Sequence, residues 1–257
     1  MVTYISSISN QVVKAAKQLK NKNKRYESGL YIAEGENVVL EAVLHCPCDI
    51  VRIFVTEKFI DLIDHYNFEI CVVPDYIMEA ISDTKSPQGV LAVMKMADTR
   101  FNVSDTDIAV YLDNVSDPGN IGTIIRTADA AGITTVILSP ECADNYSPKI
   151  IRATMGSCFH INIIKENNYL EILKSLTDSG FQAIAGSLQA KLSHYEADLK
   201  EKSVICLGNE AHGLSEELMS INNICPVKIP IVGKAESLNV SIAGAVMMYE
   251  ALRQRGI

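Results

Sequence analysis

Five polar residues beside three glycine-containing loops are the strongest candidates for chemistry in this sequence. They are two asparagines, an arginine, a glutamate and a serine: Asn120, Arg126, Glu210, Ser237 and Asn239. Guanidinium and amide groups donate hydrogen bonds, and a carboxylate can hold such donors in place. Together they could bind a phosphate or stabilise an oxygen that gains negative charge in a reaction. An Arg–Glu pair alone would be no more than a structural ion pair; five polar residues from three loops favour a site.

Other familiar sites lack their signatures. Gly119 and Gly122 match the dinucleotide fingerprint only weakly, and the sequence has neither a Walker loop nor a Gly-x-Ser-x-Gly elbow. The five histidines are scattered, so we expect no metal site. The one close cysteine pair, Cys46 and Cys48, does not have Cys-x-x-Cys spacing. The seven cysteines are therefore interpreted as reduced thiols of a cytoplasmic protein.

The elements that must position the five residues are strands that alternate with helices. Apolar runs predict strands at 108–112, 203–207 and 226–230, and each run precedes one of the three loops. Crossover helices between such strands give a mainly parallel sheet that is covered on both faces. Ligands of these sheets bind at the carboxyl ends of the strands, so we expect the three loops to meet there.

Two of the loops lead into helices. Pro118 and Gly119 fit the centre of a type II turn, and a helix is expected from about Asn120 to Ala131, with Asn120 and Arg126 on roughly the same side. After Ser237 and Asn239, a helix over 240–252 is apolar on almost every side. A helix of this kind must be buried in a core or in a subunit interface.

The first part of the chain has its own α/β pattern. Helices are expected at 10–20, 36–45 and 57–66, and strands at 30–33, 50–55, 69–73 and 90–96. The segment 97–107 is polar and aperiodic, which indicates a domain boundary. We therefore expect a small α/β domain at 1–98 and a second α/β domain at 107–257.

The charge distribution bears on possible partners. The net charge of −8 argues against a general nucleic-acid binder, but residues 1–30 carry six basic residues against Glu27 alone. A local stripe of basic residues can contact phosphates even when the net charge of the protein is negative. Such a stripe can also be a solvated helix face. The stripe comprises Lys14, Lys17, Lys20, Lys22, Lys24 and Arg25. No apolar run is long enough to cross a membrane, and the first residues do not resemble a signal peptide.

Three segments carry a family resemblance. They are 113–128 (DNVSDPGNIGTIIRTA), 207–215 (LGNEAHGLS) and 229–241 (IPIVGKAESLNVS). In this order they resemble the three motifs of the SpoU family of RNA ribose 2′-O-methyltransferases, which belongs to the SPOUT superfamily. Residues 1–98, with a Ser-Pro-Gln-Gly-Val segment at 86–90, are similar to the α/β substrate-binding domain of many members. The resemblance covers nearly the whole chain.

The resemblance implies a trefoil knot in the second domain, a homodimer and S-adenosylmethionine as cofactor. It implies that Asn120, Arg126, Glu210, Ser237 and Asn239 are catalytic. The implied cofactor-binding residues are Leu207, Gly208, Asn209, Ile229, Pro230, Gly233 and Leu238. Ribosomal RNA is favoured over transfer RNA because the separate first domain resembles that of the ribosomal-RNA members. A catalytically silent RNA-binding dimer and a nucleotide-binding oxidoreductase are the alternatives, and the missing fingerprint disfavours the oxidoreductase.

Overall fold

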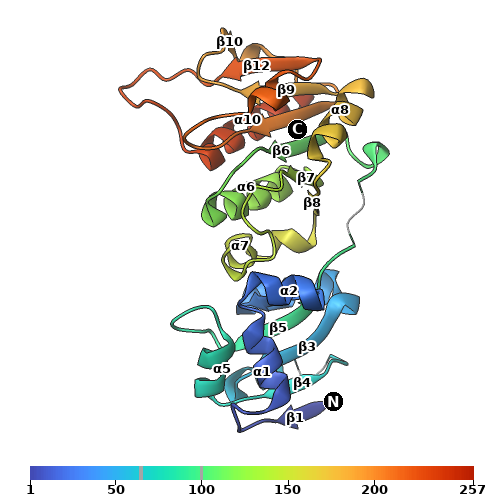
Figure 1. Ribbon diagram of the computed structural model, residues 1–257, viewed down its shortest axis with the longest axis vertical. Coiled ribbons are helices and arrows are strands. Elements are labelled where there is room, and N and C mark those ends of the chain that lie inside the picture. Colours follow the sequence, from blue (N-terminus) through green and yellow to red (C-terminus); the bar gives the residue numbers. More distant parts are fainter. Residues whose placement is uncertain (64–65, 99–100) are drawn as a thin grey trace. The chain divides into compact units, whose positions relative to one another are not determined.

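The computed structural model describes residues 1–63, 66–98 and 101–257, and the chain forms two units (Figure 1). Unit 1 comprises Met1–Asp98 and Asp144–Phe159, and unit 2 comprises Thr99–Ala143 and His160–Ile257. Residues 144–159, which the sequence pattern assigned to the second domain, thus cluster with unit 1. The predicted linker at 97–107 includes residues 99–100, and the predicted helix at 57–66 includes residues 64–65; these four lie outside the described residues.

Unit 1 is built on a five-stranded sheet in the order β1-β4-β3-β5-β2. Its strands are β1 (Val2–Tyr4), β2 (Leu30–Glu34), β3 (Ile50–Val55), β4 (Ile70–Val72) and β5 (Val90–Lys95). Its helices are α1 (Gln11–Gln18), α2 (Lys22–Ser28), α3 (Glu36–His45), α4 (Ile60–Ile63), α5 (Asp75–Ile81) and α7 (Pro148–Ala153), with 3-10 turns η1 (Pro47–Asp49), η2 (Glu57–Phe59) and η4 (Ser157–Phe159). Strand β5 runs antiparallel to both neighbours, whereas β1, β4 and β3 are parallel. The carboxyl ends of β1, β2, β3 and β4 therefore share one edge.

The two faces of the unit 1 sheet bury separate cores. Along β3, Ile53 and Val55 pack in a cluster with α3 and α4, whereas Phe54 packs in a cluster with α1 and α5. This alternation follows from the two-residue period of a strand. Helix α1 lies within the predicted range 10–20. Asn10 caps its first turn, and Val13 is buried whereas Lys14 is exposed, so the helix is amphipathic.

Unit 2 contains a seven-stranded parallel sheet in the order β10-β12-β9-β11-β6-β7-β8. Its strands are β6 (Ile108–Leu112), β7 (Thr135–Leu138), β8 (Asn162–Lys165), β9 (Gln182–Gly186), β10 (Leu192–Ser193), β11 (Ser203–Leu207) and β12 (Ile224–Lys228). Its helices are α6 (Pro118–Ala130), α8 (Tyr169–Asp178), α9 (Glu216–Met219) and α10 (Val240–Arg255), with 3-10 turns η3 (Val103–Asp105) and η5 (His194–Glu196). The mixed α/β class and the mainly parallel second sheet are confirmed. The predicted knot stays a prediction.

Helix α10 packs on α6 and on β11. A Cβ atom added at Gly244 would lie 2.7 Å from Cδ1 of Leu207, so a glycine lets the helix approach the strand closely. The opposite side of α10 is open, and the side chains of Ile242 and Tyr249 are each 51% exposed. The apolar character predicted for this helix thus covers one packed side and one exposed side.

None of the helices in the described ranges is long and apolar enough to cross a membrane.

Candidate functional site

The three predicted loops do meet at one edge of the unit 2 sheet. Strands β6 and β11 are paired in register up to Leu112 and Leu207, so the loops that follow them start side by side. Strand β12 ends at Lys228, two strands away beyond β9, and its chain continues into the exposed segment 229–239. Parallel pairing alone brings these polar segments together, as expected from their positions after strands.

A cavity of about 430 Å³ opens at this edge. Its lining includes five of the predicted cofactor-binding residues: Leu207, Gly208, Asn209, Ile229 and Leu238. Pro230 and Gly233, from the same prediction, are not among the lining residues. The cavity falls within the usual size of small-molecule sites, about 300–1,000 Å³.

The wall between β11 and α9 is a tight loop held by its own backbone. Asn209 and Gly213 exchange two backbone hydrogen bonds of 2.9 and 2.8 Å. A Cβ atom added at Gly208 would lie 2.2 Å from the carbonyl carbon of Gly213, so only glycine allows this turn. The side chain of Asn209 fixes the loop further, because its Oδ1 accepts from the backbone of Ala211 and its Nδ2 donates to the carbonyl of Asn114.

A chain of hydrogen bonds joins residues from all three loops. Nδ2 of Asn120 donates to Oε1 of Glu210 at 2.6 Å, and Nδ2 of Asn239 donates to Oδ1 of Asn120 at 2.9 Å. Because the carboxylate can only accept, it determines which end of the Asn120 amide faces Asn239. The sequence predicted that these three residues converge, and the structure places them in direct contact.

The two helices beside this chain of hydrogen bonds, α6 and α10, each begin with a side-chain cap. Oδ1 of Asn239 accepts from the backbone N–H groups of Ser241 and Ile242, so α10 begins at Val240. Oδ1 of Asp117 accepts from Asn120 N at 2.9 Å, and α6 begins at Pro118. The predicted type II turn at Pro118 and Gly119 is wrong: the fixed φ of proline here occupies the first helical position, where its missing N–H costs nothing.

Arg126 and Ser237 do not take part in the chain of hydrogen bonds. Arg126 is exposed on α6 and makes no hydrogen bond or ion pair with the described residues. At about 100° per residue, six helical residues leave Asn120 and Arg126 about 120° apart around the axis, so the expectation that both lie on the same side is wrong. Ser237 is also exposed and lines the cavity.

Two further parts of the site were not predicted. Residues 186–189, at the end of β9 and directly after it, line the cavity; their place at the carboxyl end of a strand was an available signal. Asp113 is fully buried after β6; its Oδ2 accepts from Ser215 N at 2.7 Å, and its Oδ1 has no partner among the described residues. Burial raises the pKa of the neighbouring Tyr111, and the Asp113 carboxylate adds to that shift.

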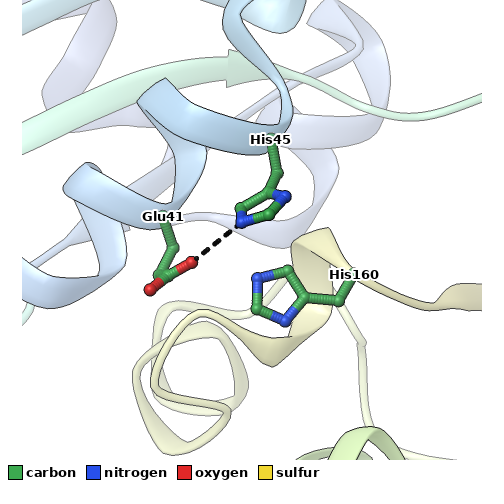
Figure 2. A group of neighbouring side chains, drawn as sticks. All are labelled: Glu41, His45 and His160. Atoms are coloured by element: carbon green, nitrogen blue, oxygen red, sulfur yellow. Dashed lines mark ion pairs between the residues drawn. The ribbon is translucent and has the colours of Figure 1, made fainter. Parts of the chain in front are cut away.

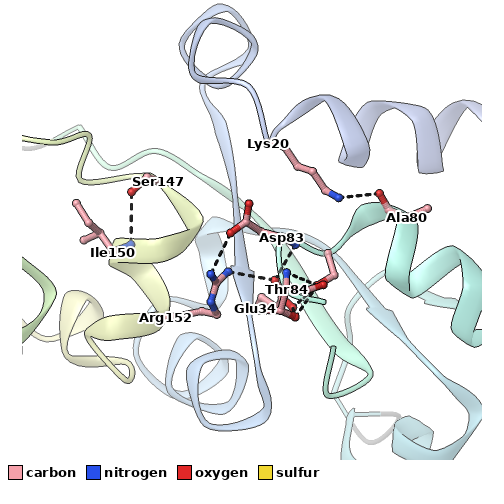
Figure 3. Close-up of polar contacts among 9 residues, drawn as sticks. Lys20, Glu34, Ala80, Asp83, Thr84, Ser147, Ile150 and Arg152 are labelled. Atoms are coloured by element: carbon pink, nitrogen blue, oxygen red, sulfur yellow. Dashed lines mark hydrogen bonds and ion pairs between the residues drawn. The ribbon is translucent and has the colours of Figure 1, made fainter. Parts of the chain in front are cut away.

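The six residues of the basic stripe lie in unit 1 and differ in their surroundings. Lys14 and Lys17 are exposed on α1, and Lys22 is exposed at the start of α2. Lys24 pairs with Glu27 at 2.7 Å. Nζ of Lys20 donates to the carbonyl of Ala80 at 2.9 Å (Figure 3), and burial lowers the pKa of this lysine.

Arg25 has the opposite character, because its side chain is 3% exposed. It donates to the carbonyls of Leu19 and Lys20 at 2.8 and 3.0 Å, and it forms an ion pair with the buried carboxylate of Asp144. The hydroxyl of Tyr26 donates to the same carboxylate at 2.9 Å. Arg25 therefore ties α2 to the segment 144–159 rather than facing a ligand.

Two groups of titratable side chains in unit 1 form hydrogen bonds or ion pairs with neighbouring residues. The carboxylate of Glu34, 3% exposed, accepts from Thr84 Oγ1 at 2.6 Å, from Asp83 N at 3.1 Å and from Arg152 Nη1 at 3.4 Å (Figure 3). On α3, Glu41 and His45 form an ion pair of 3.3 Å one turn apart (Figure 2). The carboxylate of Glu34 thus finds its partners within unit 1.

Two family models match this chain. Residues 107–249 match the model of the SpoU rRNA Methylase family, and residues 10–92 match the model of the MRM3-like substrate binding domain.

Similar proteins match along nearly the whole chain. The 23S rRNA (guanosine(2553)-2′-O)-methyltransferase RlmP of Bacillus subtilis is 32% identical over 95% of this chain and 97% of its own length. A 23S rRNA (uridine(2479)-2′-O)-methyltransferase of Streptomyces viridochromogenes is 29% identical over 92% and 87%. The crystal structure of an AdoMet-bound rRNA methyltransferase from Sinorhizobium meliloti superposes with a TM-score of 0.85 at 30% identity, covering 98% of both chains.

Proposed function

The chain belongs to the SpoU rRNA methylase family, and from this premise we propose that it methylates a ribose 2′-hydroxyl of ribosomal RNA with S-adenosylmethionine as methyl donor. The observation that carries the proposal is the convergence of Asn120, Glu210 and Asn239 beside a cavity of about 430 Å³. Relatives named as acting on 23S rRNA match both units, which favours ribosomal RNA over transfer RNA.

The cavity suits the cofactor. Gly208 leaves no room for a side chain, so the backbone itself forms the wall, and a flat or bent ligand can lie against it. Leu207 and Leu238 would pack against the cofactor, and backbone groups at Gly208 and Ile229 would bind its polar edges. S-adenosylmethionine would supply an electrophilic methyl group on a sulfonium. The protein then needs mainly to orient the 2′-oxygen and help it lose its proton.

The polar residues divide this task. A guanidinium stays protonated at physiological pH, so Arg126 is a poor base. We assign it to the phosphate next to the target ribose, where its charge also stabilises the alkoxide, and the proton passes to that phosphate or to water. Asn120 and Asn239 orient the ribose, Glu210 fixes the Asn120 amide, and Ser237 contacts the nucleotide from the cavity rim.

A homodimer is supported by the open side of α10. Ile242, Ala245, Val246 and Tyr249 recur at three- and four-residue spacing, so they form one apolar stripe on the helix. Two of them are half exposed, and a second copy would cover them. Replacing Val246 with Glu should place a charge in this stripe and yield monomers, measured by sedimentation velocity. A wild-type chain that sediments as a fully active monomer would refute the homodimer.

The cytoplasm is the proposed location, because ribosomal RNA is the proposed substrate. All seven cysteines are free thiols, which suits a reducing compartment.

The function is tested with methyl-labelled S-adenosylmethionine and a 23S rRNA transcript that carries no modifications. We expect one labelled nucleotide whose 3′ phosphodiester resists alkaline hydrolysis, because a methylated 2′-oxygen cannot attack it. Label in a transfer RNA pool and none in the 23S transcript would show that transfer RNA is the substrate. RNA binding without label in any RNA would show a silent binding protein.

A further inference from the structure

The edge of unit 1 that carries the strand carboxyl ends contains a second cavity. Strand β3 is followed by α4 and the parallel strand β4 by α5, and these two helices pack on opposite faces of the sheet. Where consecutive connections leave a sheet toward opposite faces, a crevice opens between the carboxyl ends of the two strands. Unit 1 has such a crevice between Val55 and Val72.

A cavity of about 950 Å³ lies at that position. Residues after β1, β3 and β4 line it, and so does the segment 85–89 before β5. The cavity is formed entirely within unit 1 and is separate from the site in unit 2. Its volume is at the upper end of the range for small-molecule sites and could hold a nucleotide.

The floor of this cavity has an unused polar group. Thr56 is only 7% exposed, it lines the cavity, and its hydroxyl makes no hydrogen bond to the described residues. A Cβ atom added at Gly89 would lie 2.7 Å from this hydroxyl and 2.9 Å from Cδ2 of Phe59. Gly89 has φ of +100°, so a glycine is needed both for this backbone and for the close approach of Thr56 and Phe59. Because solvent in the cavity reaches this hydroxyl oxygen, and it has no partner among the described residues, it is open to a hydrogen bond with a ligand.

The other lining groups define the chemistry of the ligand. Phe59 offers an aromatic ring with Nζ of Lys58 5.4 Å from its centroid, and the largely exposed ring of Tyr4 lies at the rim. The charged lining residues are of both signs, namely Lys58, Lys85, Glu57, Asp75 and Glu79. This mixture does not suit a run of phosphates. It suits one nucleotide, with a base that stacks on a ring and donates to carboxylates, and a phosphate near a lysine.

We propose that this cavity binds an unpaired nucleotide of the RNA substrate. The inference rests on the proposed function, and it names where unit 1, which matches a substrate-binding domain, contacts the RNA. Single-stranded RNA is the form in which bases can leave the stack and enter such a cavity. The nucleotide held here is distinct from the one that is methylated, because the chemistry belongs to unit 2.

Lysine footprinting tests the proposal on the wild-type protein. The protein is acetylated briefly with and without an unmodified 23S rRNA transcript, and each lysine is quantified by mass spectrometry. We expect RNA to slow the modification of Lys58 and Lys85 several-fold. Lys95 is the internal reference, because it is exposed at the opposite edge of the same sheet. Equal rates at Lys58 and Lys85 with and without RNA, under conditions where the RNA is bound, would overturn the proposal.

Variants give a second measurement. Thr56→Val removes the hydroxyl at nearly constant shape, and Lys85→Gln removes a charge; together they should raise KM for the RNA about tenfold, the scale of one or two lost hydrogen bonds. The loss should appear in KM rather than kcat, and the affinity for S-adenosylmethionine should not change. Thr56→Ser keeps the hydroxyl and should have the KM for RNA of the wild-type protein. Lys95→Gln is the matched control for Lys85→Gln.

The outcomes separate this inference from the proposed function. A protein that methylates the transcript but shows neither protection nor a change in KM has the function without this site. A protein that shows protection but no methylation has the site without the function.

Discussion

The two units present the same feature, an edge of strand carboxyl ends with a cavity, and build it differently. In unit 2 the polar side chains at the edge bond directly to one another, from Glu210 through Asn120 to Asn239 and on to the start of α10. In unit 1 the cavity residues form no such chain, and the hydroxyl of Thr56 is left open. Preorganised polar groups suit chemistry, whereas open groups and rings suit recognition.

The difference also extends to buried charges. Unit 1 contains the buried pair of Arg25 and Asp144 and the satisfied carboxylate of Glu34, and both join the segment 144–159 to the rest of the unit. In unit 2 the corresponding buried acid, Asp113, keeps one oxygen without a partner among the described residues. The buried charges of unit 1 thus join two segments of that unit, whereas the Asp113 carboxylate of unit 2 is fully buried and does not line the cavity.

The largest expected effect is on stability and belongs to unit 1. Arg25→Gln leaves the carboxylate of Asp144 buried without its ion pair, which should cost about 3–5 kcal/mol of unfolding free energy. Urea unfolding followed by circular dichroism measures this cost, and Lys14→Gln on the exposed face of α1 is the control. If the two variants unfold at the same urea concentration, Arg25 is no structural residue and belongs with the exposed lysines.

Unit 2 should show a loss of catalysis without a loss of stability. Arg126→Ala removes an exposed side chain with no partner among the described residues, so folding and cofactor binding should persist. Turnover should fall about 100- to 1000-fold, the usual effect of removing one group that stabilises developing charge. Single-turnover kinetics at saturating RNA measures this, with Lys174→Ala on α8 as the control. Full turnover in the purified Arg126 variant would remove this residue from the mechanism.

The α/β architecture behind both edges could be predicted from the sequence, because each edge follows from strands that alternate with helices. The convergence of the three loops in unit 2 needed only their positions after strands. The partners within the site could not be predicted: the bonds of Asn120 to Glu210 and Asn239 depend on side-chain geometry that no residue spacing contains.

The missed elements have physical reasons. Helix α2 has only one buried residue, Arg25, so it shows no apolar period. Strand β1 is a three-residue edge strand whose side chains are all exposed. The segment 144–159 packs in unit 1 through contacts between residues far apart in the sequence, such as that of Arg25 with Asp144, and no local pattern predicts such contacts.

A substitution at Gly208 tests whether the rigid wall of the unit 2 cavity contacts the cofactor. In Gly208→Ala the new methyl group would overlap the backbone at Gly213, so the wall of the cavity must shift. Overpacking costs about 1–3 kcal/mol. If the bound cofactor requires the original wall, a cost of this size in the bound state lowers the affinity for S-adenosylmethionine roughly tenfold to hundredfold. Isothermal titration measures it. Gly132→Ala, where nothing lies within 4 Å of the added methyl group, should leave the affinity unchanged, although the φ of +68° at Gly132 disfavours any other residue. Equal cofactor affinity in both variants would show that the Gly208 wall does not contact the cofactor.

The smallest expected effect concerns the exposed lysines of unit 1. Lys14, Lys17 and Lys22 form no hydrogen bond or ion pair with the described residues, unlike Lys20 and Lys24, so they are the better candidates for phosphate contacts. Changing these three to Gln should flatten the slope of log affinity against log salt by about two units, because each neutralised phosphate contributes slightly less than one unit. The affinity at low salt should fall together with the slope, because the same phosphate contacts contribute to both. Filter binding of the 23S transcript over a salt series measures both quantities, and cofactor affinity should not change because the cavity lies in unit 2. An unchanged slope would mean that α1 and α2 present only a solvated face, and that unit 1 binds RNA through its cavity alone.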